Sequence, residues 1–348
     1  MATELTNEPD SFAEQPNANE VRRLTIFADR MFARLPAALS EAYPPARRTA
    51  IAAEGLEFFA VRDEPIKVRA FGCDADPSAV TVETVMPDCP FIVDSIREYF
   101  RGRDRAVHAL LHPLFQLQRN AGGALLSFEQ GAGAERPESF THAELAIPAT
   151  SANCRALERD LLRILTQVRD ATGDFAAMTA RTLQICEETA AQRELVEVRD
   201  FLRWLVQSGF VFLGYRRYRI EPVDGRVAIL ADGGSSLGIM RNETGSRFLR
   251  PTPLGTLEEG LRKLLFDGPV LIIGKTRAEA EVHRRALMDD ITLRRIDAKG
   301  QPIGFDRFIG LFTSKAYSEE AEHIPVLRAK LREEIGRASC RERVCVPV

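Results

Sequence analysis

A short segment rich in proline and acidic residues joins a strand-like stretch to a helix-like stretch, and its residue types suit the binding of a small polar molecule. It reads Pro87-Asp88-Cys89-Pro90-Phe91-Ile92-Val93-Asp94. A turn that leads into a helix presents backbone N–H groups and the positive end of the helix dipole, which suit a carboxylate. We predict an effector site for an amino acid, formed by Asp88, Cys89, Pro90, Phe91 and Asp94. Asp88 would meet the ligand's ammonium group and Phe91 would close its apolar side.

The alternative interpretation of this segment is a tight turn in which Asp88 only caps the helix. Three other motifs fail on their spacing. His108 and His112 lie on a predicted strand, where four residues span roughly 13 Å, so they cannot chelate one metal ion. Gly274-Lys275-Thr276 resembles the end of a phosphate-binding loop, but Pro269 occupies the position of its first glycine. The segment from Gly233 to Gly238 lacks the GxGxxG spacing. We therefore predict no catalytic, cofactor-binding or metal-binding residue in this chain.

Length and composition indicate a globular protein with two domains. The chain has 348 residues, of which 45% are hydrophobic and 28% are charged. Lys and Arg together number 47 against 50 Asp and Glu, a balance that argues against nucleic acid or a membrane surface as the partner. Neither a secretory signal nor an apolar run long enough to cross a bilayer is visible, so we expect a cytoplasmic protein with reduced cysteines.

Hydrophobic periodicity predicts a pair of helices followed along the chain by an α/β unit. Residues 1–20 are polar and are expected to form a disordered tail, and 21–61 reads as a helical preface interrupted by Tyr43-Pro44-Pro45. Within 62–171, the predicted elements are strands over 66–71, 80–86, 106–118 and 140–147, with helices over 90–100 and 157–170. A β-α-β-β-α order with an additional strand before it is typical of a ferredoxin-like sandwich.

The residue pattern of the second half of the sequence predicts a helical connector followed by another domain. Residues 172–208 are mostly helical in pattern and end at Ser208-Gly209. Over 209–333 we predict a hairpin around Val223-Asp224-Gly225, a helix over 257–265, a buried strand over 270–273, and two paired strands over 291–296 and 303–312. The fold class is therefore α+β, with a second, largely antiparallel α+β domain.

The last residues, 334–348, do not continue the helical period that precedes them. Their composition is rich in Arg and Cys, and back-translation fits read-through of a sequencing-adapter oligonucleotide. We interpret them as an assembly artefact that packs on nothing, and we expect the natural sequence to continue differently after Glu333. The alternative is a genuine tail that binds metal or nucleic acid.

Several segments, in consistent order from about residue 25 to 333, carry a resemblance to a known family. They are Met86–Ser95, Leu111–Leu114, Glu138–Leu145, Phe201–Leu205, Phe210–Tyr215, Val282–Arg284, Arg307–Ser314 and Ile324–Arg328. Together they resemble the N-terminal region of the large-type bacterial NAD-specific glutamate dehydrogenases. The sequence departs from that pattern at Cys89, where a hydrophobic residue such as Met is usual, and over 285–290, where aromatic residues are usual.

The resemblance implies an ACT-type fold for 62–171 and a role for the chain as a regulatory and scaffolding fragment. The parent reaction would be oxidation of L-glutamate by NAD and water to 2-oxoglutarate, ammonia and NADH. NAD would belong to the parent enzyme, whose dehydrogenase core would be the partner of this fragment. The family also implies a homo-oligomer and a possible amino-acid effector. The competing hypothesis is that the chain is a stand-alone amino-acid-sensing module. A third hypothesis is that it is an independent enzyme.

Overall fold

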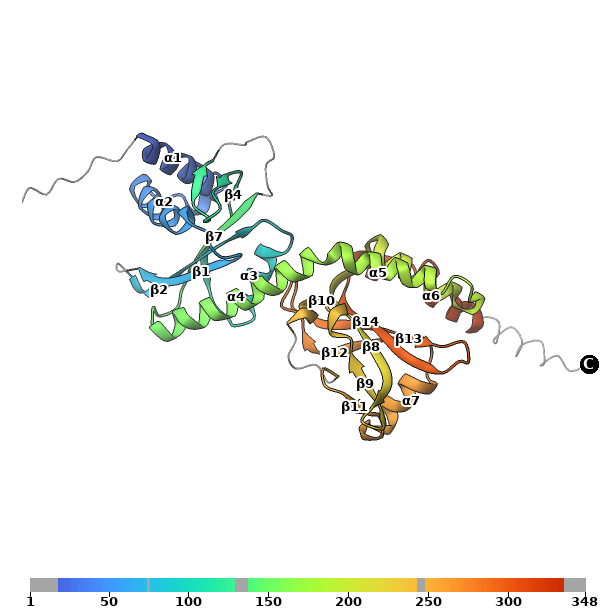
Figure 1. The fold of residues 1–348 in the computed structure, drawn as a ribbon. Coiled ribbons are helices and arrows are strands. Elements are labelled where there is room, and N and C mark those ends of the chain that lie inside the picture. The colour runs from blue at the N-terminus through green and yellow to red at the C-terminus, as the bar shows by residue number, and fades with distance from the viewer. Residues whose placement is uncertain (1–17, 74–75, 129–136, 243–247, 335–348) are drawn as a thin grey trace, which may run out of the picture. The chain divides into compact units, whose positions relative to one another are not determined.

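The computed structural model describes residues 18–73, 76–128, 137–242 and 248–334 (Figure 1). The predicted tail of 1–20 lies outside these ranges except for its last three residues, and all but Glu334 of the suspected artefact lies outside them. The described chain forms two compact units. One takes in residues up to 88 together with 105–162, and the other takes in 89–104 together with 163–334.

The first unit begins with the two predicted helices. α1 spans Ala18–Phe32 and α2 spans Pro45–Ala60. Pro45 occupies the first turn of α2, where the missing N–H costs no helical hydrogen bond. A 3-10 turn at Ala37–Leu39 lies between the helices. The helical preface is therefore present, with boundaries shifted by a few residues.

An antiparallel sheet with the strand order β1-β2-β7-β3 forms the centre of the first unit. Its strands, with the short β4 that also pairs with β7, are β1 (Lys67–Cys73), β2 (Asp76–Pro87), β3 (Val107–Leu111), β4 (Leu114–Phe115) and β7 (Glu138–Leu145). A separate pair, β5 (Gln118–Arg119) and β6 (Leu125–Ser127), lies in the connection to β7. Of the remaining elements, α3 (Ile92–Arg101) follows β2, and α4 (Ser151–Gly173) follows β7 and contains the unit boundary. The additional strand of the predicted order, β1, pairs with β2 at the edge of the sheet.

The strand predicted over 106–118 is divided into β3 and β4. Pro113 follows His112 at the break, and a proline lacks the N–H that a continuous ladder needs. The C=O of Pro113 still accepts a hydrogen bond from the Phe140 N–H at 3.1 Å. The break therefore redirects the strand without separating it from β7.

Aromatic side chains fill the core between the helical pair and the sheet. Phe27 of α1, Phe59 of α2, Phe115 of β4 and Phe140 of β7 are all fully or almost fully buried. The Phe27 ring stacks on Phe115 with centroids 4.8 Å apart and meets the edge of Phe140 at 5.2 Å. The helical preface thus contributes to the same hydrophobic core as the strands.

The second unit is built on a sheet with the strand order β11-β9-β8-β14-β13-β12. Its strands are β8 (Phe210–Val223), β9 (Arg226–Ala231), β10 (Leu237–Gly238), β11 (Thr252–Pro253), β12 (Leu271–Glu279), β13 (Leu287–Ile296) and β14 (Pro302–Phe312). All its pairings are antiparallel, and the sheet curls in Figure 1. The α+β class and the antiparallel second domain are confirmed.

The helices of the second unit beyond α4 are α5 (Phe175–Glu188), α6 (Val196–Trp204), α7 (Glu259–Asp267) and the short α8 (Ser314–Ser318). Met178 and Ile185 of α5 and Leu202 of α6 share a buried cluster with Phe212 and Phe308 of the sheet. A second cluster joins Leu265 of α7 to Tyr218 of β8 and Phe305 of β14. The segment expected to be a connector therefore supplies core to the second unit.

The strand predicted to be buried over 270–273 is longer and more exposed than expected. β12 runs to Glu279 and pairs only with β13, so it is an edge strand of the sheet. Lys275 lies within β12 and pairs with Asp289 at 2.6 Å. A short apolar run cannot distinguish an edge strand from a central one.

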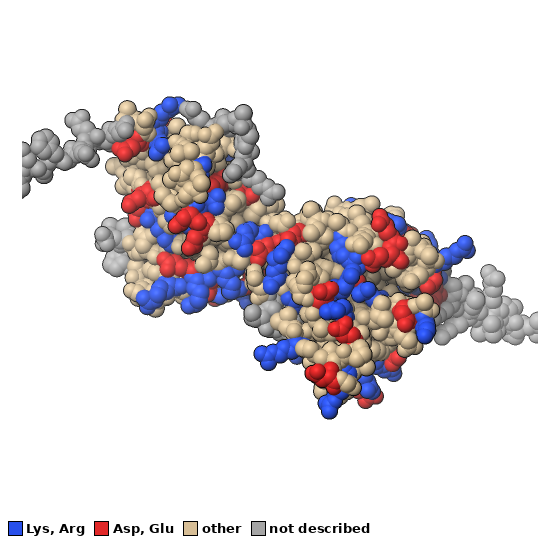
Figure 2. All heavy atoms as spheres, in the orientation of Figure 1, with Lys and Arg blue, Asp and Glu red and all other residues tan. Residues whose placement is uncertain are grey.

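Figure 2 shows acidic and basic side chains on both units, with basic side chains gathered along the lower edge of the first unit in this view. Of the described helices, none combines the length and apolar character needed to cross a membrane.

We expect Phe27→Ala to lower the free energy of unfolding by about 3–5 kcal/mol, because it removes a fully buried ring from the aromatic core. Val21→Ala on the same helix, where the side chain is exposed, is the matched control and should change it by less than about 0.5 kcal/mol. Urea unfolding of both variants measures the difference. Equal effects of the two changes would show that α1 does not complete this core.

Candidate functional site

The turn between β2 and α3 departs from an ordinary helix start. Phe91 is the N-cap of α3 and has left-handed backbone angles, φ 76° and ψ 1°, where N-cap residues normally adopt extended ones. A non-glycine residue in this region costs on the order of 1–3 kcal/mol and persists only when its surroundings hold it. The N-cap residue of α3 is thus Phe91 and not Asp88. The Asp88 N–H instead donates to the Pro137 C=O at 2.7 Å.

The predicted effector residues differ in exposure. Asp88, Cys89 and Phe91 are half-buried, whereas Pro90 and Asp94 are exposed. The helix begins at Ile92, two residues after Pro90, and its first hydrogen bond joins the Ser95 N–H to the Phe91 C=O at 3.0 Å. The segment thus places the exposed Asp94 close in sequence to the half-buried Phe91 and Asp88.

His283 is the neighbour of this turn that the sequence does not indicate. Its imidazole ring lies 4.7 Å from the Phe91 ring between centroids, and its backbone N–H donates to Ser95 Oγ at 3.0 Å. Its Nδ1 lies 3.5 Å from Asp94 Oδ2. His283 also has a positive φ, 69°. Two of the segments on which the family resemblance rests, around Phe91 and around His283, are therefore in contact, and each places a non-glycine residue in a strained conformation.

In the first unit, the polar face of the sheet is buried instead of solvated. His142 of β7 is 3% exposed, with Nδ1 2.9 Å from Glu83 Oε1 and Nε2 3.5 Å from Glu144 Oε1. Arg69 pairs with Glu83 at 2.6 Å, and Arg47 of α2 pairs with Glu144 at 2.9 Å. Burial of these charges is tolerated because each one has an oppositely charged partner.

The carboxylates determine the charge of this histidine. Burial lowers the pKa of His142, but hydrogen bonds to Glu144 and Glu83 outweigh it and raise the pKa above its usual value. Burial likewise raises the pKa of Glu144, but the hydrogen bond with His142 and the charges of His142 and Arg47 lower it to about 2. The two carboxylates therefore favour the protonated form of His142.

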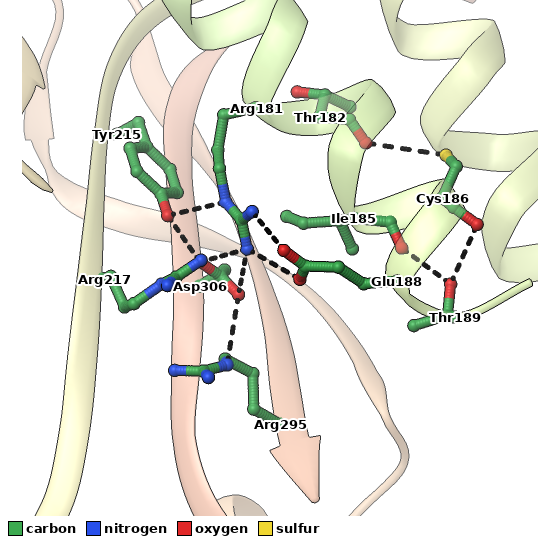
Figure 3. Close-up of polar contacts among 10 residues, drawn as sticks. All are labelled: Arg181, Thr182, Ile185, Cys186, Glu188, Thr189, Tyr215, Arg217, Arg295 and Asp306. Carbon is green, nitrogen blue, oxygen red and sulfur yellow. Dashed lines mark hydrogen bonds and ion pairs between the residues drawn. The ribbon is translucent and has the colours of Figure 1, made fainter.

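The second unit contains a charged cluster around Asp306 of β14, which is 1% exposed (Figure 3). Tyr215 donates its hydroxyl hydrogen to this carboxylate. Arg181 of α5 lies 3.4 Å from both of its oxygens, Arg217 of β8 lies 3.2 Å away, and Arg295 of β13 lies 3.9 Å away. Burial and the neighbouring Asp306 raise the pKa of Tyr215, which therefore stays a hydrogen-bond donor.

These two clusters were not predicted from the sequence, although it carries a signal for them. Strand alternation places His142 on the face opposite Ala143 and Leu145, and places Asp306 on the same face as Phe308. A charged residue on a face that also carries large apolar side chains indicates a buried ion pair. His108 is exposed as expected, and His112 bonds Ser139 Oγ at 2.7 Å.

The charge of His142 makes the stability of the first unit depend on pH. A histidine whose folded pKa is raised stabilises the fold below its unfolded pKa of about 6.5, and this contribution is lost as the pH rises through the folded value. We expect the free energy of unfolding to fall over this window, and His142→Gln to reduce the fall. His108→Gln, an exposed histidine of the same unit, is the control. Identical pH profiles for His142→Gln and the unmodified chain would contradict a protonated His142.

Comparison with known proteins agrees with the family resemblance. Residues 27–161 match the family model described as glutamate dehydrogenase, ACT1 domain. The chain is 31% identical over 296 residues, 80% of its length, to the NAD-specific glutamate dehydrogenase of Pseudomonas aeruginosa. It is 32% identical over 256 residues, 70% of its length, to that of Halomonas elongata, and 26% identical over 258 residues, 71% of its length, to that of Mycobacterium tuberculosis.

The chain spans only 18%, 16% and 15% of these three relatives, respectively. The region that matches the family model includes the end of α1, the whole of α2, the buried His142 cluster and the β2–α3 turn. The predicted resemblance is confirmed. The chain belongs to the NAD-specific glutamate dehydrogenase family and corresponds to a part of it that contains the ACT1 domain.

Proposed function

We propose that this chain is the regulatory and scaffolding region of an NAD-specific glutamate dehydrogenase. The observation that carries the proposal is the match of 27–161 to the ACT1 domain, together with similarity to dehydrogenases many times its length. The parent enzyme would oxidise L-glutamate to 2-oxoglutarate and ammonia, and NAD would accept the hydride. The partner of this region would be the dehydrogenase core of the parent enzyme, within a cytoplasmic homo-oligomer.

Placing the chemistry outside this region is supported by the backbone of the β2–α3 turn. A dinucleotide site needs glycines between strand and helix, so that the pyrophosphate can approach the helix N-terminus closely. The corresponding positions here carry Asp88, Cys89, Pro90 and Phe91, and the bulky Phe91 is the N-cap. The same turn suits a small carboxylate better than a dinucleotide.

An amino-acid effector would bind at this turn, where Asp88, Cys89, Pro90, Phe91 and Asp94 gather around the start of α3. First-turn N–H groups and the helix dipole favour the ligand's carboxylate. Asp94, whose side chain is 55% exposed, and Asp88 are acceptors for its ammonium group. The half-buried Phe91 ring offers an apolar wall. Binding there would act on the contact of this turn with His283, because Asp94 and Phe91 both touch that residue.

The purified chain alone should form no NADH from glutamate and NAD and should not bind NAD, because the proposal places the nucleotide site in the dehydrogenase core. Absorbance at the NADH band and calorimetric titration with NAD measure the two properties. An active glutamate dehydrogenase in the same buffer is the positive control. NADH formation that a single substitution in this chain abolishes would overturn the proposal.

Calorimetric titration of the chain with a panel of amino acids tests the effector site. We expect micromolar-to-millimolar binding of at least one amino acid, weakened about tenfold or more by Asp88→Ala, because a charge-assisted hydrogen bond contributes about 1.5–3 kcal/mol. Glu57→Gln, on the exposed side of α2, is the control. If no amino acid binds while the chain self-associates with concentration, the turn is instead a structural interface.

A further inference from the structure

The charged cluster around Asp306 in the second unit contains more positively charged groups than negatively charged ones. Three guanidinium groups, from Arg181, Arg217 and Arg295, surround two carboxylates, those of Asp306 and Glu188. The cluster therefore carries a net charge of one positive unit. Figure 3 shows the three arginines approaching Asp306 from different elements.

The excess charge can be located, because the arginines differ in how many of their donors are used. Arg181 is fully engaged: Nε donates to Tyr215 Oη at 3.1 Å, and Nη1 and Nη2 donate to Glu188 at 2.7 and 3.0 Å. Arg217 donates to Asp306 only through Nε, and Arg295 approaches it no closer than 3.9 Å. Within the described ranges of the chain, the terminal nitrogens of Arg217 and Arg295 form no hydrogen bond.

These two arginines lie at an accessible place in the sheet. Their side chains are 25% and 31% exposed, although the carboxylate they share is almost completely buried. In the strand register, Asp306 is opposite Arg217, and Gly304 is opposite both Arg219 and Arg295. Because glycine has no side chain, nothing projects from β14 between Arg219 and Arg295. Gly304 has φ 153°, so another residue would be strained there.

We propose that Arg217 and Arg295 form a binding site for the carboxylate of a small organic acid. The planar guanidinium fork matches a carboxylate in a bidentate arrangement. One carboxylate would neutralise the excess charge, whereas a phosphate, with a charge of about −1.5 to −2, would leave net negative charge next to Asp306 and Glu188. The choice of ligand rests on the proposed function: the organic acids of the parent reaction are L-glutamate and 2-oxoglutarate. The site is separate in sequence from the β2–α3 turn.

Arg295→Met tests the proposal with little risk to folding, because the 3.9 Å approach to Asp306 is the weakest contact in the cluster. The full chain is titrated separately with L-glutamate, 2-oxoglutarate and inorganic phosphate. We expect one of the two organic acids to bind more tightly than phosphate, and Arg295→Met to weaken that binding about tenfold or more. Arg217→Lys keeps the charge but removes the fork and should weaken it as well. Arg226→Met, an exposed arginine of β9, is the matched control.

The outcomes separate this site from the effector site at the turn. Binding that Arg295→Met weakens and Asp88→Ala leaves unchanged supports the arginine site. Binding that responds only to Asp88→Ala, binding that neither variant affects, a preference for phosphate, or no binding of either organic acid would each overturn it. Thermal unfolding of Arg295→Met and Arg226→Met at the same midpoint would show that lost binding does not reflect lost structure.

Discussion

A carboxylate buried against a helix-covered sheet face is the constraint on which both units depend. Glu83 and Asp306 are each 1% exposed, and an ionised carboxylate taken out of water is tolerated only when cations and hydrogen-bond donors replace its hydration. In the first unit, Arg69 and His142 supply them. In the second, Arg181, Arg217 and Tyr215 do. Charge also joins a helix to each sheet, because Arg47 of α2 pairs with Glu144 and Arg181 of α5 pairs with Asp306.

The helix α2 shows how closely the two requirements are combined. A side chain at Gly55 would lie 3.1 Å from the Phe140 ring and 3.5 Å from Glu83 Oε1, so this glycine lets the helix approach both the aromatic core and the buried acid. Arg47, in the first turn of the same helix, reaches Glu144. Propensity alone would disfavour a glycine within a helix by about 1 kcal/mol relative to alanine. The close approach explains why this position has no side chain.

Most secondary-structure elements could be predicted from the sequence, because their apolar spacing reflects one buried side. The helices of the preface, the hairpin of β8 and β9, and the pairing of β13 with β14 were all predicted within a few residues. Two features were not predictable from such patterns. The edge position of β12 depends on strand order, and the burial of His142 depends on α2 covering a face that looks polar in sequence. Both are tertiary properties, to which periodicity along one strand is insensitive.

The β2–α3 turn shows the same limit for the candidate site. Its residue types indicated a polar binding turn, but nothing in Pro90-Phe91-Ile92 signals a left-handed phenylalanine, since such strain is imposed by long-range contacts. The ring of His283, almost two hundred residues away, supplies one of them, and the Ser95 hydroxyl accepts the hydrogen bond that holds the His283 backbone. The two strained residues therefore support each other.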